Sequence, residues 1–260
     1  MRTALAVALL ALCAVAGSAA AVREATPMPL VVALDLGGRP YQSGSVRGGE
    51  VTFATGFEVE LARALARRLG AGSVRFVHVP RARLLARGSK RWRLALARLQ
   101  RGVSGSLAFS VAYLAADQAV VLRRGLPRPA RLGALRRLQL CAERGTPAAR
   151  VIASAIRPSL RPLLLPDADA LVRRVQTGLC DAGLVEASSL GRFVAGRRAR
   201  LGAVAGRVET GVAYAVALER GDPLRARVDA ALRALRADGT LARLRRASLG
   251  GDPERLRVLR

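Results

Sequence analysis

The sequence predicts an α/β protein in which buried strands alternate with amphipathic helices along the chain. Residues 30–34 form a short apolar run, residues 55–70 carry a helical apolar pattern, and residues 73–79 are rich in β-branched and aromatic residues. Strand, helix and strand in this order form the basic unit of a parallel sheet. The same order recurs over residues 160–186, and a last strand at residues 211–220 is followed by helices.

A helix is expected over residues 55–70, which read TGFEVELARALARRLG. Thr55 and Glu58 have the spacing of a capping box, in which both side chains bond to free amides at a helix start. Apolar residues recur at every fourth position from Phe57 to Leu65 and predict the buried face, which leaves Glu58 on the surface. Gly70 is expected to end this helix. The helix is interpreted as scaffold that packs on a core.

The alternation continues through the rest of the chain. Strands are expected at residues 119–122, 138–144, 160–166, 182–186 and 211–220. Helices are expected to begin where a capping residue precedes an apolar pattern, at Thr146 with Pro147, at Asp167 or Asp169, and at Asp222 with Pro223. Residues 88–106 mix basic and apolar residues, end in a Gly/Ser stretch and predict no clear element.

The first residues predict a signal peptide at residues 1–21. Arg2 precedes an apolar run over residues 4–16, which is too short to span a bilayer, and Ala19–Ala21 supply a cleavage site. Cys13 lies inside the apolar run, which argues against a lipoprotein. The mature chain is therefore expected to be exported and soluble, in the periplasm or another extracytoplasmic space.

The net charge of the 260 residues is +26, and Lys90 is the only lysine. The arginines are scattered along the expected helices, and aromatic residues make up only 3% of the chain. An exported protein of this kind is not predicted to bind nucleic acid. A general bias towards arginine is the favoured reading, and attraction to an anionic cell surface is the alternative.

Removal of the signal peptide would leave two cysteines, Cys141 and Cys180. An even number of cysteines in an oxidising compartment favours a disulfide. Two unpaired, buried thiols are the alternative at this stage.

No catalytic or cofactor-binding motif is found. His78 is the sole histidine and lies between two valines of an expected strand, so no base for a serine nucleophile stands out. Neither metal-ligand spacing nor a glycine-rich phosphate motif occurs. Groups suited to a small polar ligand do follow strands or begin helices, where open α/β sheets bind ligands, namely Asp35, Ser110, Gly145, Thr146 and Glu186.

Five motifs occur in a recognisable order. They are GFEVEL at residues 56–61, FSVAY at 109–113, GT at 145–146, GLCDAGLVE at 178–186 and the block at 211–244. In this order and spacing they resemble the family 3 extracellular solute-binding proteins, the receptors of polar amino-acid ABC importers. The third and fourth motifs are similar to that family's GT turn and G-x-x-D-A strand, and the second to its FSxPY hinge element with Ala112 in place of proline. The resemblance covers nearly all of the mature chain.

The resemblance implies a periplasmic-binding-protein-like fold of type II, with two α/β lobes joined by a two-strand hinge that closes on a ligand. Lobe one would comprise residues 22–113 with 211–260, and lobe two residues 114–210. The implied function is capture of a small polar, amino-acid-like solute and its delivery to an ABC transporter permease in the inner membrane. A monomer without enzymatic activity, cofactor or metal is expected.

The resemblance also implies the ligand contacts. An acid and an aromatic residue near the first loop correspond to Asp35 and Tyr41, the GT turn would bind an α-carboxylate, and Glu186 an α-amine. Ser110 of the hinge element is a further candidate. The family's T-x-x-R clamp is absent, because Gln100 and Val103 occupy its positions.

Arg101 is a candidate to take the place of the clamp arginine, but only after a local shift of the chain. Loss of a bidentate guanidinium removes about 1.5–3 kcal/mol of binding. A degenerate receptor or sensor component is therefore one alternative function, and a periplasmic dehydratase of cyclic dienyl acids on the same scaffold is another. The resemblance places the strands of Cys141 and Cys180 side by side, and on this map a disulfide within lobe two is predicted.

Overall fold

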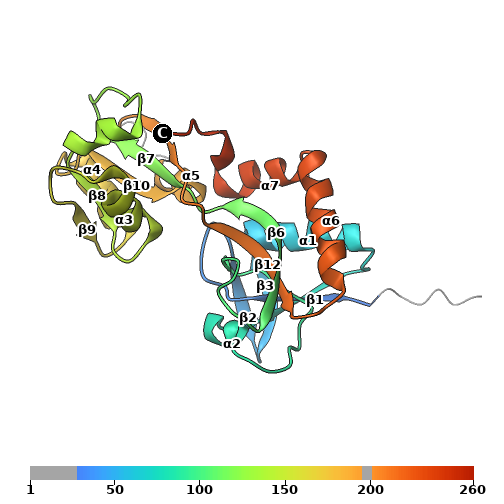
Figure 1. The fold of residues 1–260 in the computed structure, drawn as a ribbon. Helices are drawn as coiled ribbons and strands as arrows, with labels where there is room; N and C mark the ends of the chain where they lie inside the picture. Colours follow the sequence, from blue (N-terminus) through green and yellow to red (C-terminus); the bar gives the residue numbers. More distant parts are fainter. Residues whose placement is uncertain (1–27, 195–200) are drawn as a thin grey trace, which may run out of the picture.

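The computed structural model describes residues 28–194 and 201–260, so the predicted signal peptide lies outside the described residues. Two β-sheets with helices packed against them form two lobes, which lie side by side in Figure 1. The predicted α/β fold with two lobes is thereby confirmed. Within the described residues, no helix has both the length and the apolar character needed to cross a membrane.

The larger lobe is built on a seven-stranded mixed sheet in the order β2-β3-β4-β1-β5-β12-β6. Its strands are β1 (Leu30–Leu34), β2 (Ser43–Arg47), β3 (Glu50–Thr55), β4 (Val74–His78), β5 (Leu94–Ala95), β6 (Leu107–Ala115) and β12 (Ala213–Glu219). Its helices are α1 (Phe57–Leu69), α2 (Arg81–Leu85), α6 (Leu224–Ala237) and α7 (Thr240–Leu249). Helices α1, α6 and α7 contact one another and share one apolar core with this sheet, because their buried positions recur at helical spacing.

The smaller lobe is built on a five-stranded sheet in the order β11-β7-β10-β8-β9. Its strands are β7 (Gln118–Leu122), β8 (Leu140–Glu143), β9 (Leu163–Leu165), β10 (Ala182–Glu186) and β11 (Val204–Val208). Its helices are α3 (Pro147–Val151), which continues as a π-helical turn (Ile152–Ile156), α4 (Ala168–Gln176) and α5 (Leu190–Val194). The side chain of Asp167 accepts the amide of Ala170 at 2.7 Å, so the predicted cap of α4 is confirmed.

The predicted disulfide is also present in this lobe. Cys141 lies in β8 and Cys180 directly precedes β10, and these two strands pair in parallel. Their Cα atoms are 6.0 Å apart. The sequence map that placed the two strands side by side is therefore confirmed.

Two segments connect the lobes. The chain leaves the larger lobe between β6 and β7 and returns between β11 and β12 (Figure 1). The amide of Ala116 donates to the carbonyl of Val212 at 2.9 Å, so the two crossing segments are bonded to each other. We propose that the lobes divide at these crossings, as expected for residues 22–113 with 211–260 and for residues 114–210, except that residues 251–260 pack on the smaller lobe.

The residues after α7 run back to the smaller lobe and lie along β11. The amide of Arg207 donates to the carbonyl of Arg257 at 2.7 Å, and the amide of Leu259 donates to the carbonyl of Arg207 at 2.8 Å. The Leu259 side chain is buried among apolar residues of the smaller lobe. A Cβ on Gly206 would lie 2.4 Å from the carbonyl oxygen of Arg257, so this close approach requires glycine. We call residues 251–260 the C-terminal strap.

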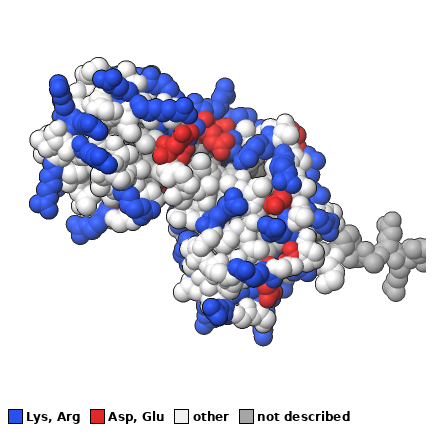
Figure 2. Space-filling model, in the orientation of Figure 1, with Lys and Arg blue, Asp and Glu red and all other residues white. Residues whose placement is uncertain are grey.

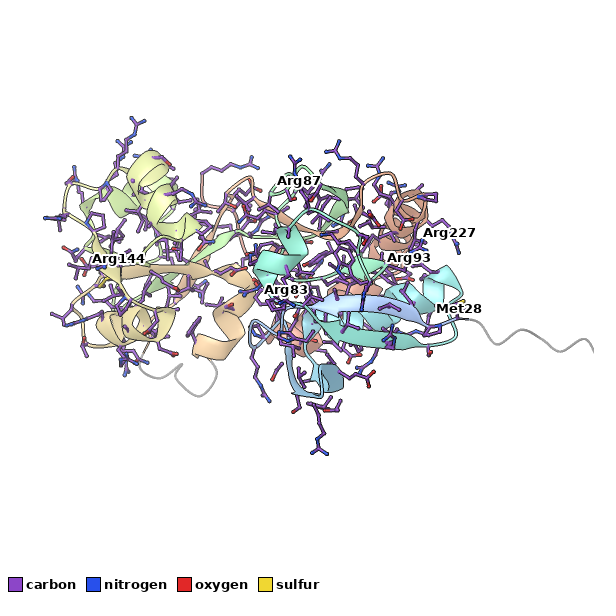
Figure 3. The ribbon with its side chains drawn as sticks, turned by 90° about the horizontal axis from the view of Figure 1, so that it is seen from below. Met28, Arg83, Arg87, Arg93, Arg144 and Arg227 are labelled. Carbon is purple, nitrogen blue, oxygen red and sulfur yellow. A yellow bond between two sulfur atoms is a disulfide. The ribbon has the colours of Figure 1, made fainter. Side chains whose placement is uncertain are left out.

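Basic side chains are spread over both lobes on the face shown in Figure 2, whereas acidic side chains gather near the junction of the lobes and also appear at separate places on the larger lobe. The exposed arginines labelled in Figure 3 also occur on both lobes, with Arg144 on the smaller lobe and Arg83, Arg87, Arg93 and Arg227 on the larger one. This distribution fits a general arginine bias better than one basic patch.

Candidate functional site

A cavity of about 210 Å³ lies between the lobes. Its polar lining includes Tyr41, Arg98 and Tyr214 from the larger lobe and Glu143, Thr146 and Glu186 from the smaller one. Leu171, Val185 and Phe193 of the smaller lobe supply an apolar wall. Cavities for drug-sized ligands measure about 300–1,000 Å³, so this one suits a smaller molecule.

Tyr41 connects the two lobes inside this cavity. Its hydroxyl donates to the carboxylate of Glu186 and shares a hydrogen bond with the hydroxyl of Ser188. The single hydroxyl proton of Ser188 can be donated either to Tyr41 or to Glu186, which lies 3.0 Å from it. Burial raises the pKa of Tyr41 well above its ordinary value, and the charge of Glu186 raises it further, so the hydroxyl stays protonated and donates. Two of the predicted site residues, Tyr41 and Glu186, are thus in direct contact.

Tyr214 packs its ring against Tyr41, with the ring planes nearly perpendicular and the centroids 6.2 Å apart. Burial raises the pKa of Tyr214, and the charge of Glu186 raises it further. Tyr214 belongs to β12, the strand that returns to the larger lobe, so its position follows from the hinge topology.

Arg98 is a cation of the cavity, as is the more exposed Arg39, and the sequence predictions missed both. Its guanidinium lies over the Tyr41 ring, 5.0 Å from the centroid. Among the described residues, no carboxylate lies within ion-pair distance of this guanidinium. Burial lowers the pKa of Arg98, but the acidic groups of Tyr41, Glu186 and Glu58 outweigh it and raise the pKa overall. The side chain therefore remains charged and open to an anionic ligand group.

Glu58 is hydrogen-bonded to the residues that carry Arg98 and Tyr41 in the cavity. The prediction that Glu58 forms a capping box is wrong. Helix α1 begins after Gly56 without any side-chain cap, and Glu58 is fully buried. Its carboxylate accepts hydrogen bonds from the backbone N–H of Arg98 at 2.8 Å, from the hydroxyl of Tyr113 and from the side-chain amide of Gln42. Burial raises the pKa of Glu58, whereas these hydrogen bonds lower it in part.

The GT turn contributes Thr146 to the cavity wall, while Gly145 is exposed beside it in a left-handed conformation with φ 75°. The Thr146 hydroxyl donates to the carbonyl of Glu143 at 2.6 Å and thereby closes the turn before α3. Asp35 lies at the end of β1, where its carboxylate accepts the amide of Gly37 at 3.1 Å. Asp35 is not among the residues that line the cavity.

Two other predicted residues lie away from the cavity. The Ser110 hydroxyl is buried within the pairing of β6 and β12, where it accepts the amide of Val216 at 3.0 Å. Gln100 forms a β-bridge with Tyr214, and the chain then turns outwards, so Arg101 is exposed and borders a different depression. Arg101 therefore does not replace the clamp arginine in this structure.

One signal in the sequence could have indicated Arg98. It follows the apolar run Leu94–Ala97, and a charged residue directly after a buried strand often faces a ligand site in an α/β sheet. Because basic and apolar residues are mixed over residues 88–106, the sequence predicts no clear strand end there.

The sequence also matches a protein family over residues 30–250, namely "Bacterial extracellular solute-binding proteins, family 3". The chain belongs to this family. No curated protein sequence matches the chain. Since the residues described contain no group of three or more metal-ligating side chains, no metal centre is indicated among them.

Solved structures of family 3 type share this fold. An ancestral cationic amino acid solute-binding protein, AncCDT-1, is similar with 21% identity and a TM-score of 0.65, covering 85% of this chain and 95% of that one. The L-cystine solute receptor of Neisseria gonorrhoeae, in its unliganded open conformation, has 16% identity and a TM-score of 0.70 over 87% and 94%. AbpA from Streptococcus pneumoniae, bound to L-arginine, has 24% identity and a TM-score of 0.57 over 85% and 94%.

Proposed function

We propose that this family 3 protein is the exported substrate-binding component of an ABC uptake system and captures a small polar, amino-acid-like solute between its lobes. One observation carries the proposal. The larger lobe contributes the guanidinium of Arg98 and the smaller lobe the carboxylate of Glu186 to the same cavity of about 210 Å³. A zwitterion would complement both charges at once.

The placement of Arg98 and Glu186 on different lobes explains how a ligand would favour closure of the lobes. A ligand that contacts both Arg98 and Glu186 interacts with both lobes and would favour the conformation in which they are close. Tyr41 already links the lobes through Glu186 and Ser188, so a ligand would enter a partly organised site. We propose Tyr41, Arg98, Thr146 and Glu186 as ligand contacts, whereas the expected contacts Asp35 and Gly145 are not among the residues that line the cavity.

The wider setting is also proposed. The family is described as extracellular, and several similar structures are ABC transporter substrate-binding proteins. On this ground the protein would act outside the cytoplasm as a monomer and deliver its solute to a membrane permease. It would bind without catalysis.

The proposal is tested by thermal-shift screening of amino acids, polyamines and small organic acids. A ligand at 100 times its Kd should stabilise the protein by about 2.7 kcal/mol. Loss of the Arg98 guanidinium in Arg98→Ala should cost about 1.5–3 kcal/mol of binding, because a charge-assisted hydrogen bond is removed.

Arg101→Ala is the matched control, since Arg101 is exposed outside the cavity. Equal loss of binding in both variants would contradict the assignment of Arg98. Failure of every compound to stabilise the wild type would contradict uptake of an amino-acid-like solute. One similar structure is described as a precursor of cyclohexadienyl dehydratase, so loss of prephenate or arogenate should also be assayed, and turnover would contradict the non-enzymatic role.

A further inference from the structure

We propose that the buried carboxylate of Glu58 is a positioning residue of the ligand site, which holds the backbone of Arg98 so that its guanidinium enters the cleft. The inference rests on the proposed function. It adds the residue that directs the Arg98 side chain towards the ligand.

The backbone of Arg98 needs such support. Its φ is 48°, in the left-handed region that residues with a Cβ rarely adopt. A residue persists there when surrounding contacts over-determine it. The neighbouring carbonyls are already bonded, because Ala97 accepts from Arg81 at 2.6 Å and Leu99 accepts from the amide of Ala215 at 3.0 Å.

The amide of Arg98 finds its acceptor in Glu58. The N–H of Arg98 donates to Oε1 of Glu58 at 2.8 Å. This bond fixes the peptide plane before the Cα of Arg98 and hence the direction in which its side chain leaves the turn. Without this hydrogen bond, the backbone of Arg98 could relax towards the commoner negative φ. Its guanidinium would then move away from the Tyr41 ring.

The same carboxylate also holds a second loop of the larger lobe, the one that carries Tyr41. Its Oε2 accepts the side-chain amide of Gln42, the residue next to Tyr41. Gln42 in turn donates to the carbonyl of Leu96 and accepts the amide of Leu36 at 2.9 Å. Glu58 thus ties the loop of Tyr41 to the turn of Arg98, and the two side chains that stack in the cleft share one buried anchor.

A purely structural role for Glu58 makes a different prediction. As a core polar group it would affect folding, but its effect on ligand affinity would not depend on the side chain at position 98. As a positioning residue it acts chiefly through Arg98, whose amide it accepts directly, so removing the guanidinium should strongly reduce its effect on affinity. A double-mutant cycle separates these two roles.

The cycle uses Glu58→Gln and Arg98→Asn, alone and together. Asn tolerates a left-handed backbone but carries no guanidinium. Affinity is measured by calorimetry with L-arginine, L-glutamine and L-cystine as probes. We expect Glu58→Gln to weaken the best-bound probe by about tenfold or more in the wild type and by less than about twofold in the Arg98→Asn background. Equal weakening in both backgrounds would overturn the proposal.

Glu60→Gln is the matched control, because Glu60 lies on the same helix, pairs with Arg63 and is partly exposed. It should change affinity by less than about twofold. Tyr113→Phe removes another partner of Glu58 while the bond to Arg98 stays, and it should weaken binding less than Glu58→Gln.

Crystal structures of the variants test the role of Glu58 without any ligand. In Glu58→Gln, or in Glu58→Asp if the first variant does not fold, the guanidinium of Arg98 should move off the Tyr41 ring. An unchanged Arg98 conformation in the folded variant would refute the role of Glu58. If none of the probes binds the wild type, the proposed function fails, while the crystal structures still decide the role of Glu58.

Discussion

The carboxylate of Asp117 and the guanidinium of Arg207 form an ion pair at the junction of the two lobes. Asp117 follows β6 on the outgoing crossing, and Arg207 belongs to β11, which leads into the returning one. Their side chains are only 7% and 14% exposed. Asp117 also accepts the amide of Thr210 at 3.2 Å. The pair therefore joins the outgoing and returning segments of the hinge.

Breaking this pair should destabilise the protein strongly. Asp117→Ala removes the buried partner of the Arg207 guanidinium and leaves it only the half-exposed Glu209, and we expect the free energy of unfolding to fall by about 3 kcal/mol. Glu209→Gln is the control, because Glu209 lies 3.5 Å from Arg207 but is 50% exposed, and a loss below about 1 kcal/mol is expected there. Urea denaturation measures both, and equal losses would contradict the importance of the buried pair.

The disulfide should contribute to the stability of the smaller lobe. Cys141 and Cys180 are 39 residues apart in sequence, and a cross-link over such a loop typically adds about 2–4 kcal/mol, chiefly by restricting the unfolded chain. The variant with alanine at both positions should lose this amount and should no longer respond to reductant. Two titratable thiols in the denatured, unreduced wild type would show that the bond does not form.

The C-terminal strap should stabilise the smaller lobe through the buried side chain of Leu259. This side chain is 2% exposed in the core of the smaller lobe, and Leu259→Ala is expected to cost about 2–4 kcal/mol by creating a cavity. Arg260→Ala is the control, since the Arg260 side chain is 83% exposed. Thermal unfolding should show a lowered Tm for the first variant alone. Equal Tm values would mean that the strap adds little to the smaller lobe.

Glu58 should give a recognisable pH dependence of stability. Burial raises the pKa of Glu58 in the folded state above its ordinary value, although hydrogen bonds from Tyr113, Arg98 and Gln42 oppose the rise. A group of this kind contributes most stability below its unfolded-state pKa, and the contribution is lost as the pH rises through the folded-state pKa. Glu58→Gln does not titrate at this position.

The free energy of unfolding of the wild type should therefore fall relative to that of Glu58→Gln as the pH rises from about 4 to about 8. Urea denaturation at several pH values measures the difference. Glu60→Gln is the control, because it keeps Glu58 and changes an acid on the same helix, so its free energy of unfolding should fall with pH as that of the wild type does. A difference between wild type and Glu58→Gln that stays constant with pH would contradict the raised pKa.

Much of the fold could be predicted because its signals are local. The spacing of apolar residues indicates α1 and α6, Asp167 caps α4 within one turn, and Gly70 ends α1 in a left-handed conformation. The hairpin of β2 and β3 was missed, since its strands are largely exposed and lack a clean apolar alternation.

The candidate site was predicted only in part because its decisive contacts are distant in sequence. Tyr41 and Glu186 lie 145 residues apart and meet only when the lobes are assembled. Thr55 and Glu58 have a perfect local capping pattern, yet Glu58 bonds to Gln42, Arg98 and Tyr113 instead. The left-handed turn at Arg98 depends on these contacts as well, so no short stretch of sequence could reveal it.

The course of the C-terminal strap along β11 has a consequence for aggregation. Strand β11 is the last strand on its side of the smaller sheet, and an uncovered edge of this kind can recruit a strand from another molecule. The bridge between Arg207 and Val258 occupies part of that edge. Chains shortened before the strap should therefore self-associate through β11 more readily than intact ones.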